Sequence, residues 1–243
     1  MKIDKLFSDL LLDECGKKLK ELRIVDYVLG LSYVAVETEA GVGLAYMFRD
    51  AVKNGCNVMN EDLRRTPAGK VAAMINSHDL LESAIGLATI NSVLNNTDYD
   101  ESDILDHIDF QDKNVGMVGF FHPVVEKLTP IVNNLYIFEL KDIAGSFRPE
   151  YAKRILPQCD IVIISGTTFV NKTTEDFFHY IPASSKKIIL GPSTPLSKKL
   201  YEYADLYSFK VTNKKDCLDV IARGGGMKRL KACGKKVALI SKK

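Results

Sequence analysis

The sequence lacks an excess of either charge and lacks any long apolar run. Its 33 lysine and arginine residues nearly balance 31 aspartate and glutamate residues, for a net charge of +2. A protein that holds nucleic acid through bulk charge is usually strongly basic, so we expect no nucleic-acid partner. No apolar run approaches the ~18 residues of a membrane span. The first residues also show no apolar signal-peptide core. We therefore expect a cytoplasmic protein without a membrane partner.

Paired metal-ligand and redox motifs are missing as well. No C-x-x-C pair occurs, and no two cysteines lie within four residues of each other, which excludes a zinc knuckle or a redox dithiol. The four histidines form neither an H-x-x-x-H nor an H-E-x-x-H pair. A transition-metal site made by the protein alone would need ligands from distant segments. We expect reduced and mostly buried thiols. The five cysteines are Cys15, Cys56, Cys159, Cys217 and Cys233.

The first hundred residues show a helix, then strands, then helices. Apolar residues over 3–22 recur at helical spacing, which predicts an amphipathic helix. Two β-rich runs at 28–38 and 42–48 flank a short turn and predict an antiparallel hairpin. Helices are expected over 67–75 and 79–94. The first of these follows Thr66-Pro67, which is typical of an N-cap with proline at the first helical position.

The polar stretch 95–103 separates this region from one of different character. It has no apolar period, so we place the boundary there, between a domain of residues 1–100 and a domain of residues 101–243. Beyond it, near-continuous apolar strands alternate with helical segments, which is typical of a parallel sheet covered on both faces. We expect a doubly wound, Rossmann-like α/β domain. The expected strands are Val115–Phe120, Leu135–Leu140, Ile161–Ser165, Lys187–Leu190 and Leu206–Val211, and the expected helices are Pro123–Val132, Glu150–Leu156, Thr174–Tyr180, Ser197–Tyr203 and Lys214–Arg223.

Ligands of such sheets bind beyond the carboxyl ends of the strands, so the residues after each strand are candidates. Gly116 and Gly119 end the first strand and allow close backbone approach, but Phe121 fills the turn and the G-x-G-x-x-G pattern is incomplete. Glu139 closes the second strand 20 residues after Gly119, the position of a ribose-binding acid in nucleotide folds. A solvated glutamate at a strand end is the alternative.

The segment after the third strand is rich in hydroxyl groups and leads into a helix. It offers several donors and acceptors suited to a carboxylate, a phosphate or a polar ring edge. Thr173 or Thr174 fits the helix N-cap better than a ligand contact. The candidate ligand-binding residues of this segment are Gly166, Thr167, Thr168 and Asn171.

The segment after the fourth strand reads G-P-S-T-P from Gly191 to Pro195. Gly191 allows close approach, and Pro192 stiffens the turn. We expect Ser193 and Thr194 to point into the same crevice as the hydroxyl-rich segment. An ordinary strand-to-helix connection with a capping hydroxyl is the alternative.

Two residues of the first domain are further candidates. Arg65 precedes a helix and is placed to reach an anion across the domain gap, although exposed arginines usually only solvate a surface. Asn91 shares a face with Ala84 on a helix of small residues. A buried asparagine needs a partner and serves a ligand or the scaffold equally well.

Four segments resemble, in the same order, a family described as a "putative heavy-metal chelation" domain. Residues 164–173 (I-S-G-T-T-F-V-N-K-T) resemble its T-G-T-T-L-V-N-G-T loop, and residues 190–196 (L-G-P-S-T-P-L) match its segment of that sequence. Residues 83–91 and 118–121 resemble its N-terminal helix motif and its first Rossmann strand and turn. The resemblance implies an α+β domain like the N-terminal domain of enolase, a Rossmann-like domain after it, and a cleft where they meet. Lys172 departs from the family glycine and places a cation on the loop.

Three functions follow as hypotheses. The first is a protein that binds a small anionic molecule, a metal ion or a metal chelate in the cleft. Oxygen donors of the kind seen here suit a hydrated cation or a chelate better than a naked soft metal. The second is an enzyme that uses NAD or S-adenosylmethionine at Gly116, Gly119 and Glu139. The third is a non-catalytic oligomeric scaffold or sensor, for example a homodimer. No nucleophile–base pair is evident, and His122 fits an acid–base role or a helix start equally, so the question of catalysis stays open.

Overall fold

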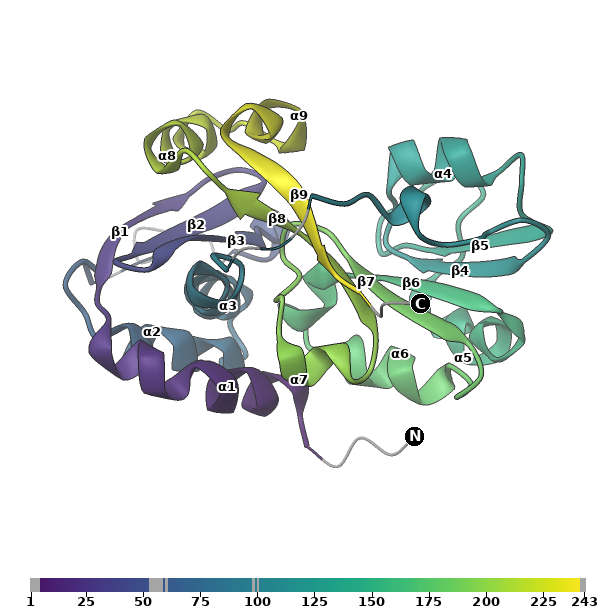
Figure 1. Ribbon diagram of the computed structural model, residues 1–243, viewed down its shortest axis with the longest axis horizontal. Coiled ribbons are helices and arrows are strands. Elements are labelled where there is room, and N and C mark those ends of the chain that lie inside the picture. The colour runs from purple at the N-terminus through teal and green to yellow at the C-terminus, as the bar shows by residue number, and fades with distance from the viewer. Residues whose placement is uncertain (1–4, 53–58, 60, 98, 100, 241–243) are drawn as a thin grey trace.

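The computed structural model describes residues 5–52, 59, 61–97, 99 and 101–240, and it contains two β-sheets (Figure 1). The three-stranded sheet has the order β1-β2-β3, and the six-stranded sheet has the order β5-β4-β6-β7-β8-β9. The strands are β1 (Ile24–Leu29), β2 (Tyr33–Thr38), β3 (Gly41–Tyr46), β4 (Asn114–Val118), β5 (Asn134–Phe138), β6 (Ile161–Ser165), β7 (Lys186–Leu190), β8 (Asp205–Val211) and β9 (Gly234–Leu239).

The small sheet differs from the expected hairpin by one strand. The run predicted as a single strand over 28–38 divides into the end of β1, a turn at 30–32, and β2. Gly30 allows this turn, because a Cβ there would come within 2.6 Å of Ile221, and its N–H donates to Tyr33 O at 2.9 Å. All three strands are antiparallel, as the hairpin prediction required for β2 and β3.

The helices of this half are α1 (Phe7–Glu21), α2 (Ala68–Ala72) and α3 (Leu80–Leu94). The prediction of the first helix is confirmed, although residues 3 and 4 lie outside the described residues. Thr66 does not cap α2, because its carbonyl accepts the N–H of Ile24 and the chain stays extended through Pro67. Asp79 caps α3 through the N–H of Leu81.

Helix α3 is the centre of the first half. It lies between the small sheet and the pair α1 and α2 (Figure 1). Close packing needs its small residues: a Cβ at Gly86 would come within 2.1 Å of the backbone of Ile75. Across the helix, a Cβ at Gly43 of β3 would meet the carbonyl of Ala88 at the same distance. The helix is therefore held on opposite sides by backbone rather than by flexible side chains.

The large sheet has five parallel strands, as predicted, and a sixth antiparallel strand, β9, that was not predicted. Residues 234–239 begin with glycine and two lysines, which is a sequence suited to a sheet edge and weak as a strand signal. The chain passes from β4 to β5 on one side and then to β6 on the other. The strand order therefore reverses between β4 and β6, which is where open α/β sheets bind ligands.

Of the five helices expected in the second half, Thr174–Tyr180 is confirmed with the same bounds, and the other four are shorter than expected. A sixth helix, at 227–230, was not expected. The helices of this half are α4 (His122–Leu128), α5 (Ala152–Ile155), α6 (Thr174–Tyr180), α7 (Lys198–Tyr201), α8 (Lys214–Ala222) and α9 (Met227–Leu230). Helix α4 covers one face of the large sheet, and α5, α6 and α7 cover the other (Figure 1). Helix α8 instead packs on β1 and β2 of the small sheet, where Cys217 and Ile221 meet Ala35. In the described part of the chain, no helix combines the length and apolar character needed to cross a bilayer.

The two halves share one apolar core that contains residues from α1 and α3 and from the large sheet. The stretch 95–103 is not purely a solvated connection, because Asn95 is buried at the end of α3. Its Nδ2 donates to Thr194 O and Ser208 Oγ, both at 2.9 Å, and its Oδ1 accepts from Leu196 N at 2.8 Å. Position 100, where the boundary was expected, lies outside the described residues.

Candidate functional site

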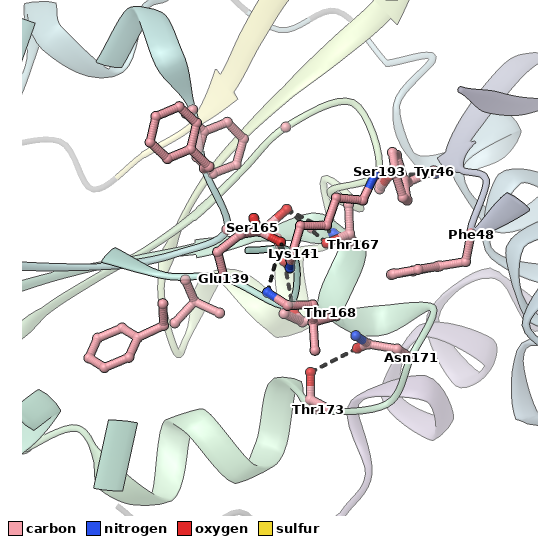
Figure 2. A pocket seen from close by; sticks show the side chains of 18 of the residues that line it. Tyr46, Phe48, Glu139, Lys141, Ser165, Thr167, Thr168, Asn171, Thr173 and Ser193 are labelled. Atoms are coloured by element: carbon pink, nitrogen blue, oxygen red, sulfur yellow. Dashed lines mark hydrogen bonds between the residues drawn. The ribbon is translucent and has the colours of Figure 1, made fainter. Parts of the chain in front are cut away.

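A cavity of about 670 Å³ lies where the carboxyl ends of β4, β5, β6 and β7 face the small sheet (Figure 2). Ten of the thirteen candidate residues from the sequence line it. These are Gly119, Phe121, Glu139, Gly166, Thr167, Thr168, Asn171, Gly191, Pro192 and Ser193. The structure thus brings together residues from four strand ends, because the strands are hydrogen-bonded neighbours in one sheet.

Two glycines shape the floor of the cavity at the strand-order reversal. Gly119 has φ 92° and Gly191 has φ 120°, a conformation that side-chain-bearing residues rarely adopt. A Cβ at Gly119 would come within 2.9 Å of Ser165 Cβ. The ring of Phe121 lies 3.8 Å from the position that a Cβ on Gly119 would take and 3.6 Å from the position that a Cβ on Gly191 would take. Phe121 therefore covers the crevice where a dinucleotide fold would seat its phosphates.

Several backbone N–H groups in and after this turn are already used. Gly119 N donates to Phe138 O at 2.8 Å. The N–H groups of Val124 and Val125 donate to Phe121 O at 2.8 and 2.9 Å, and Pro123 has no N–H. Gly119, Val124 and Val125 therefore have no free amide to offer a phosphate, which weakens the nucleotide hypothesis.

The hydroxyl-rich segment after β6 is bonded largely to itself. Ser165 Oγ accepts from Thr167 N at 3.3 Å and from Thr167 Oγ1 at 3.0 Å, which leaves its own hydrogen for the cavity. Thr168 Oγ1 donates to Ser165 O and accepts from Thr174 Oγ1, both at 2.8 Å. Thr168 therefore lines the cavity but its hydroxyl stabilises the loop. Thr173 occupies the N-cap position of α6 without a capping side-chain bond.

Asn171 presents a donor to the cavity. Thr173 Oγ1 donates to Asn171 Oδ1 at 2.8 Å, so the amide is oriented with Nδ2 as the remaining group (Figure 2). The neighbouring Lys172 has φ 61°, a left-handed conformation that glycine adopts most readily. Lys172 does not place a cation in the cavity as expected, because its Nζ donates to Ser83 Oγ at 3.1 Å and to Val170 O at 3.4 Å.

The segment after β7 is attached to the first half of the chain. Tyr46 N donates to Ser193 Oγ at 2.8 Å, and Asn91 Nδ2 donates to Ser193 O at 3.1 Å and to Leu44 O at 2.8 Å. Asn91 and Thr194 are both fully buried and do not line the cavity. Of the two hydroxyls expected in the crevice, only that of Ser193 is there, because Thr194 faces Gly166 and the protein interior.

Arg65 lies away from the cavity. It is exposed with φ 66°, its N–H donates to Ile24 O at 2.7 Å, and its carbonyl accepts from Arg23 Nη1 at 2.9 Å. The residue shapes the connection into α2, so the expected reach across the domain gap is not what the structure shows.

Several lining residues were not singled out from the sequence. Tyr33, Tyr46 and Phe48 come from the small sheet and the residues after it, and Lys141 follows Glu139 by two residues. Burial raises the pKa of Tyr33 to about 12, so its phenol stays neutral. Lys141 could have been predicted, because it lies three residues after the end of β5, where ligands of such sheets bind. The aromatic residues carry no comparable signal, since aromatic strand ends usually mark a core.

Glu139 contributes one acceptor oxygen to the cavity. Its Oε1 accepts from Leu140 N at 2.8 Å and from Lys141 N at 3.1 Å. This leaves Oε2 as the oxygen with capacity for a ligand. The arrangement fixes the carboxylate at the end of β5, next to the only positively charged side chain among the described residues that line the cavity, Lys141.

The side chains do not fit a metal ion held by the protein alone. No group of three or more His, Cys, Asp or Glu side chains suited to a metal occurs within the described ranges. The four described cysteines are free and buried, and Cys56 lies outside the described residues. Burial raises the pKa of Cys15 to about 12 and that of Cys159 to about 11. Because the thiolate is the metal-binding form, these groups are poor ligands at neutral pH.

Comparison with known proteins relates both halves of the chain to one description. A family model described as "Putative heavy-metal chelation" matches residues 103–240, and a second model of the same description matches residues 12–94. An uncharacterized protein of Methanocaldococcus jannaschii is 25% identical over 200 residues, which is 77% of each chain.

Two crystal structures of proteins with unknown function are similar over nearly the whole chain. That from Desulfitobacterium hafniense has a TM-score of 0.85 and 25% identity, covering 96% of this chain and 97% of its own. That from Pyrococcus horikoshii has a TM-score of 0.81 and 23% identity, covering 94% and 99%. Both belong to the family DUF364. The arrangement of a three-stranded antiparallel sheet and a mostly parallel six-stranded sheet is therefore that of solved structures.

Proposed function

The chain belongs to the family described as "Putative heavy-metal chelation", and on this premise we propose that it binds a small organic anion, free or as a metal chelate, in the cavity between its two sheets. The observation that carries the proposal is that hydrogen-bond donors from separate strand ends line one cavity. Among the described residues, no cluster of side chains suited to a metal ion accompanies them. The volume of the cavity lies within the range typical of small-molecule sites.

The donors favour an anionic ligand. Ser165 and Ser193 each accept a hydrogen bond from the protein, so each has a hydroxyl hydrogen to give. Asn171 offers its Nδ2, and Lys141 supplies a positive charge. Hydrogen bonds from such groups to an ionised oxygen are stronger than bonds between neutral partners. Of the two carboxylates among the described residues of the lining, Asp50 pairs with Arg49 at 3.5 Å, and Glu139 accepts two backbone N–H groups through one oxygen.

The role of a metal follows from what the cavity lacks. Since the described side chains make no metal cluster, a metal bound here would be held by oxygen atoms of the organic molecule. The protein would recognise the chelate through the organic part, and the metal would be cargo. Hard cations with oxygen ligands fit this arrangement better than soft ions that need thiolates.

Calorimetric titration with citrate, ferric citrate and ferric ion alone tests the proposal. Citrate serves as a probe because it is a small anion that chelates hard metals. We expect saturable binding of citrate or its ferric chelate and no saturable binding of ferric ion alone. Asn171→Asp keeps the acceptor for Thr173 and replaces the donor with a negative charge, so affinity should fall by at least about tenfold.

The matched control is Asn134→Asp, which adds the same charge at the amino end of β5, far from the cavity. Equal loss of affinity in both variants would show that net charge, not the cavity, governs binding. Failure of every small organic anion to bind, with or without a metal, would refute the proposed function.

A further inference from the structure

The cavity is unusually rich in aromatic side chains. Seven of its 26 lining residues are aromatic, whereas aromatic residues make up 9% of the whole chain. Both sheets contribute, so the enrichment is not the interior of one half. The seven are Tyr33, Tyr46, Phe48, Phe120, Phe121, Phe138 and Phe177.

The aromatic rings of the small sheet meet edge to face. Tyr46 and Phe48 have ring centroids 5.0 Å apart at an angle of 86°, and Tyr33 and Tyr46 are 6.4 Å apart at 88°. Perpendicular rings offer a flat guest one stacking face and one edge, the two arrangements that aromatic pairs prefer. Tyr46 and Phe48 lie on one side of the cavity, and Glu139 and Ser165 lie on the other (Figure 2).

A further aromatic surface of the cavity lies at the strand ends. Phe121 rests over Gly119 and Gly191, where no side chain protrudes beneath the ring. Phe121 and the rings of Tyr33, Tyr46 and Phe48, which form the aromatic wall, are therefore flat apolar surfaces of one cavity, and such surfaces favour a planar molecule over a branched one. Saturated rings and branched chains would forgo the stacking contacts that these side chains provide.

The polar groups add a second requirement. Lys141, Asn171, Ser165 and Ser193 are donors suited to a carboxylate. Glu139 Oε2 is an acceptor, so it pairs with a ligand hydroxyl rather than with a second anionic group. A ligand that satisfies both sets carries a carboxylate and a hydroxyl on one flat body.

We propose that the ligand class of this cavity is the hydroxy-substituted aromatic acid. This inference rests on the proposed function of the same cavity. The ring lies between the aromatic wall and Phe121, the carboxylate takes hydrogen bonds from Lys141 and Asn171, and the hydroxyl donates to Glu139. Chelation of a hard metal through both oxygens would displace the phenolic proton donated to Glu139, so this arrangement describes the metal-free acid.

Salicylate, an aromatic ring with adjacent carboxylate and hydroxyl groups, is the probe. The chain has no tryptophan, so the fluorescence of salicylate can be followed by excitation where tyrosine does not absorb. The comparison ligands are 2-hydroxycyclohexanecarboxylate, which keeps both groups on a saturated ring, benzoate, which lacks the hydroxyl, and citrate. We expect salicylate to bind at least about tenfold more tightly than the saturated analogue.

Two leucine variants locate the effect. Phe48→Leu removes an aromatic face of the cavity and should weaken salicylate binding by at least about threefold, with a smaller loss for citrate, which has no ring to stack. Phe147→Leu removes a ring that packs on Phe138 outside the cavity lining, and it should leave salicylate binding unchanged. Circular dichroism of both variants verifies that they fold.

The outcomes separate this inference from the proposed function. If citrate and the saturated analogue bind as tightly as salicylate, the aromatic class is wrong and the cavity remains an anion site. Equal loss of salicylate in both leucine variants would also overturn it, because the effect would not belong to the cavity. If none of the anions binds, the proposed function fails and the ligand class fails with it.

Discussion

Substitution of Gly119 by alanine tests the geometry at the cavity floor. The residue has φ 92°, and the added Cβ would approach Ser165 Cβ to 2.9 Å, closer than such atoms come in folded proteins. The backbone strain costs about 1–2 kcal/mol. Relief of the contact by moving β6 or the turn costs roughly a further 1–3 kcal/mol. We therefore expect the free energy of unfolding to fall by about 2–5 kcal/mol.

Gly145→Ala is the matched control for this prediction. Gly145 has a similar φ of 81°, but a Cβ there would meet nothing within 4 Å. It should therefore cost only the backbone strain, about 1–2 kcal/mol. Gly16→Ala completes the series, because Gly16 lies inside α1 with open space around its Cβ, and this change should stabilise by about 0.5–1 kcal/mol.

Urea unfolding, followed by circular dichroism, measures all three variants. The ordering Gly119, Gly145, Gly16, from most to least destabilised, is the expected result. Should Gly119→Ala cost no more than Gly145→Ala, the close approach of the β4 turn to Ser165 would be wrong, and with it the shape of the cavity floor. The slope of unfolding free energy against urea should stay equal among the variants, since none changes the exposed area appreciably.

Three further predictions concern buried polar groups, thiols and one surface ion pair. Asn91→Ala removes the side-chain donor to the carbonyls of Leu44 and Ser193, and the free energy of unfolding measured with urea should fall by about 2–4 kcal/mol. A loss below about 1 kcal/mol would contradict these buried hydrogen bonds. Burial raises the pKa values of the buried cysteine thiols, so the four described cysteines should react slowly with a thiol reagent near neutral pH until the protein unfolds. Immediate reaction of more than one thiol per native chain would argue against this burial. Burial is the largest single effect on Asp103 and raises its pKa, but the hydrogen bonds from Lys236 and from the N–H of Leu105, together with the nearby lysine charges, lower the pKa on balance. The ion pair therefore contributes stability at neutral pH that is lost as the pH falls through the pKa of the folded state. Asp103→Asn should therefore cost up to about 1 kcal/mol at neutral pH and nearly nothing in acid, as unfolding at the two pH values would show; the same cost at both would refute the linkage.

The secondary structure was predictable where one periodic pattern dominated. The amphipathic spacing of α1 and the apolar runs of the parallel strands indicated those elements from local sequence. The turn at 30–32 was missed because the β-rich composition continues through it, and Gly30 is needed there only because Ile221 of α8 lies against it. Strand β9 was missed because it is stabilised by pairing with β8, a contact that its own lysine-rich sequence does not announce.

The candidate site shows the same division. The rule that parallel strands bind ligands at their carboxyl ends was enough to select Gly119, Glu139, Asn171 and Ser193, which line one cavity. The rule says nothing of which neighbour in a loop faces inward, so Thr194 was selected although it points into the interior. It also ignores the other sheet, which supplies the aromatic wall.

Local sequence alone determined the type of most elements and the parallel sheet, because hydrophobic periodicity and strand-end chemistry act between residues close along the chain. Only the tertiary structure decided that Tyr46 and Phe48 stand opposite the strand ends, and that Asn91 and Asn95 of α3 hold the segment after β7 in place. These contacts join residues about a hundred positions apart, and they depend on how the two sheets pack through a shared core, which no local pattern specifies.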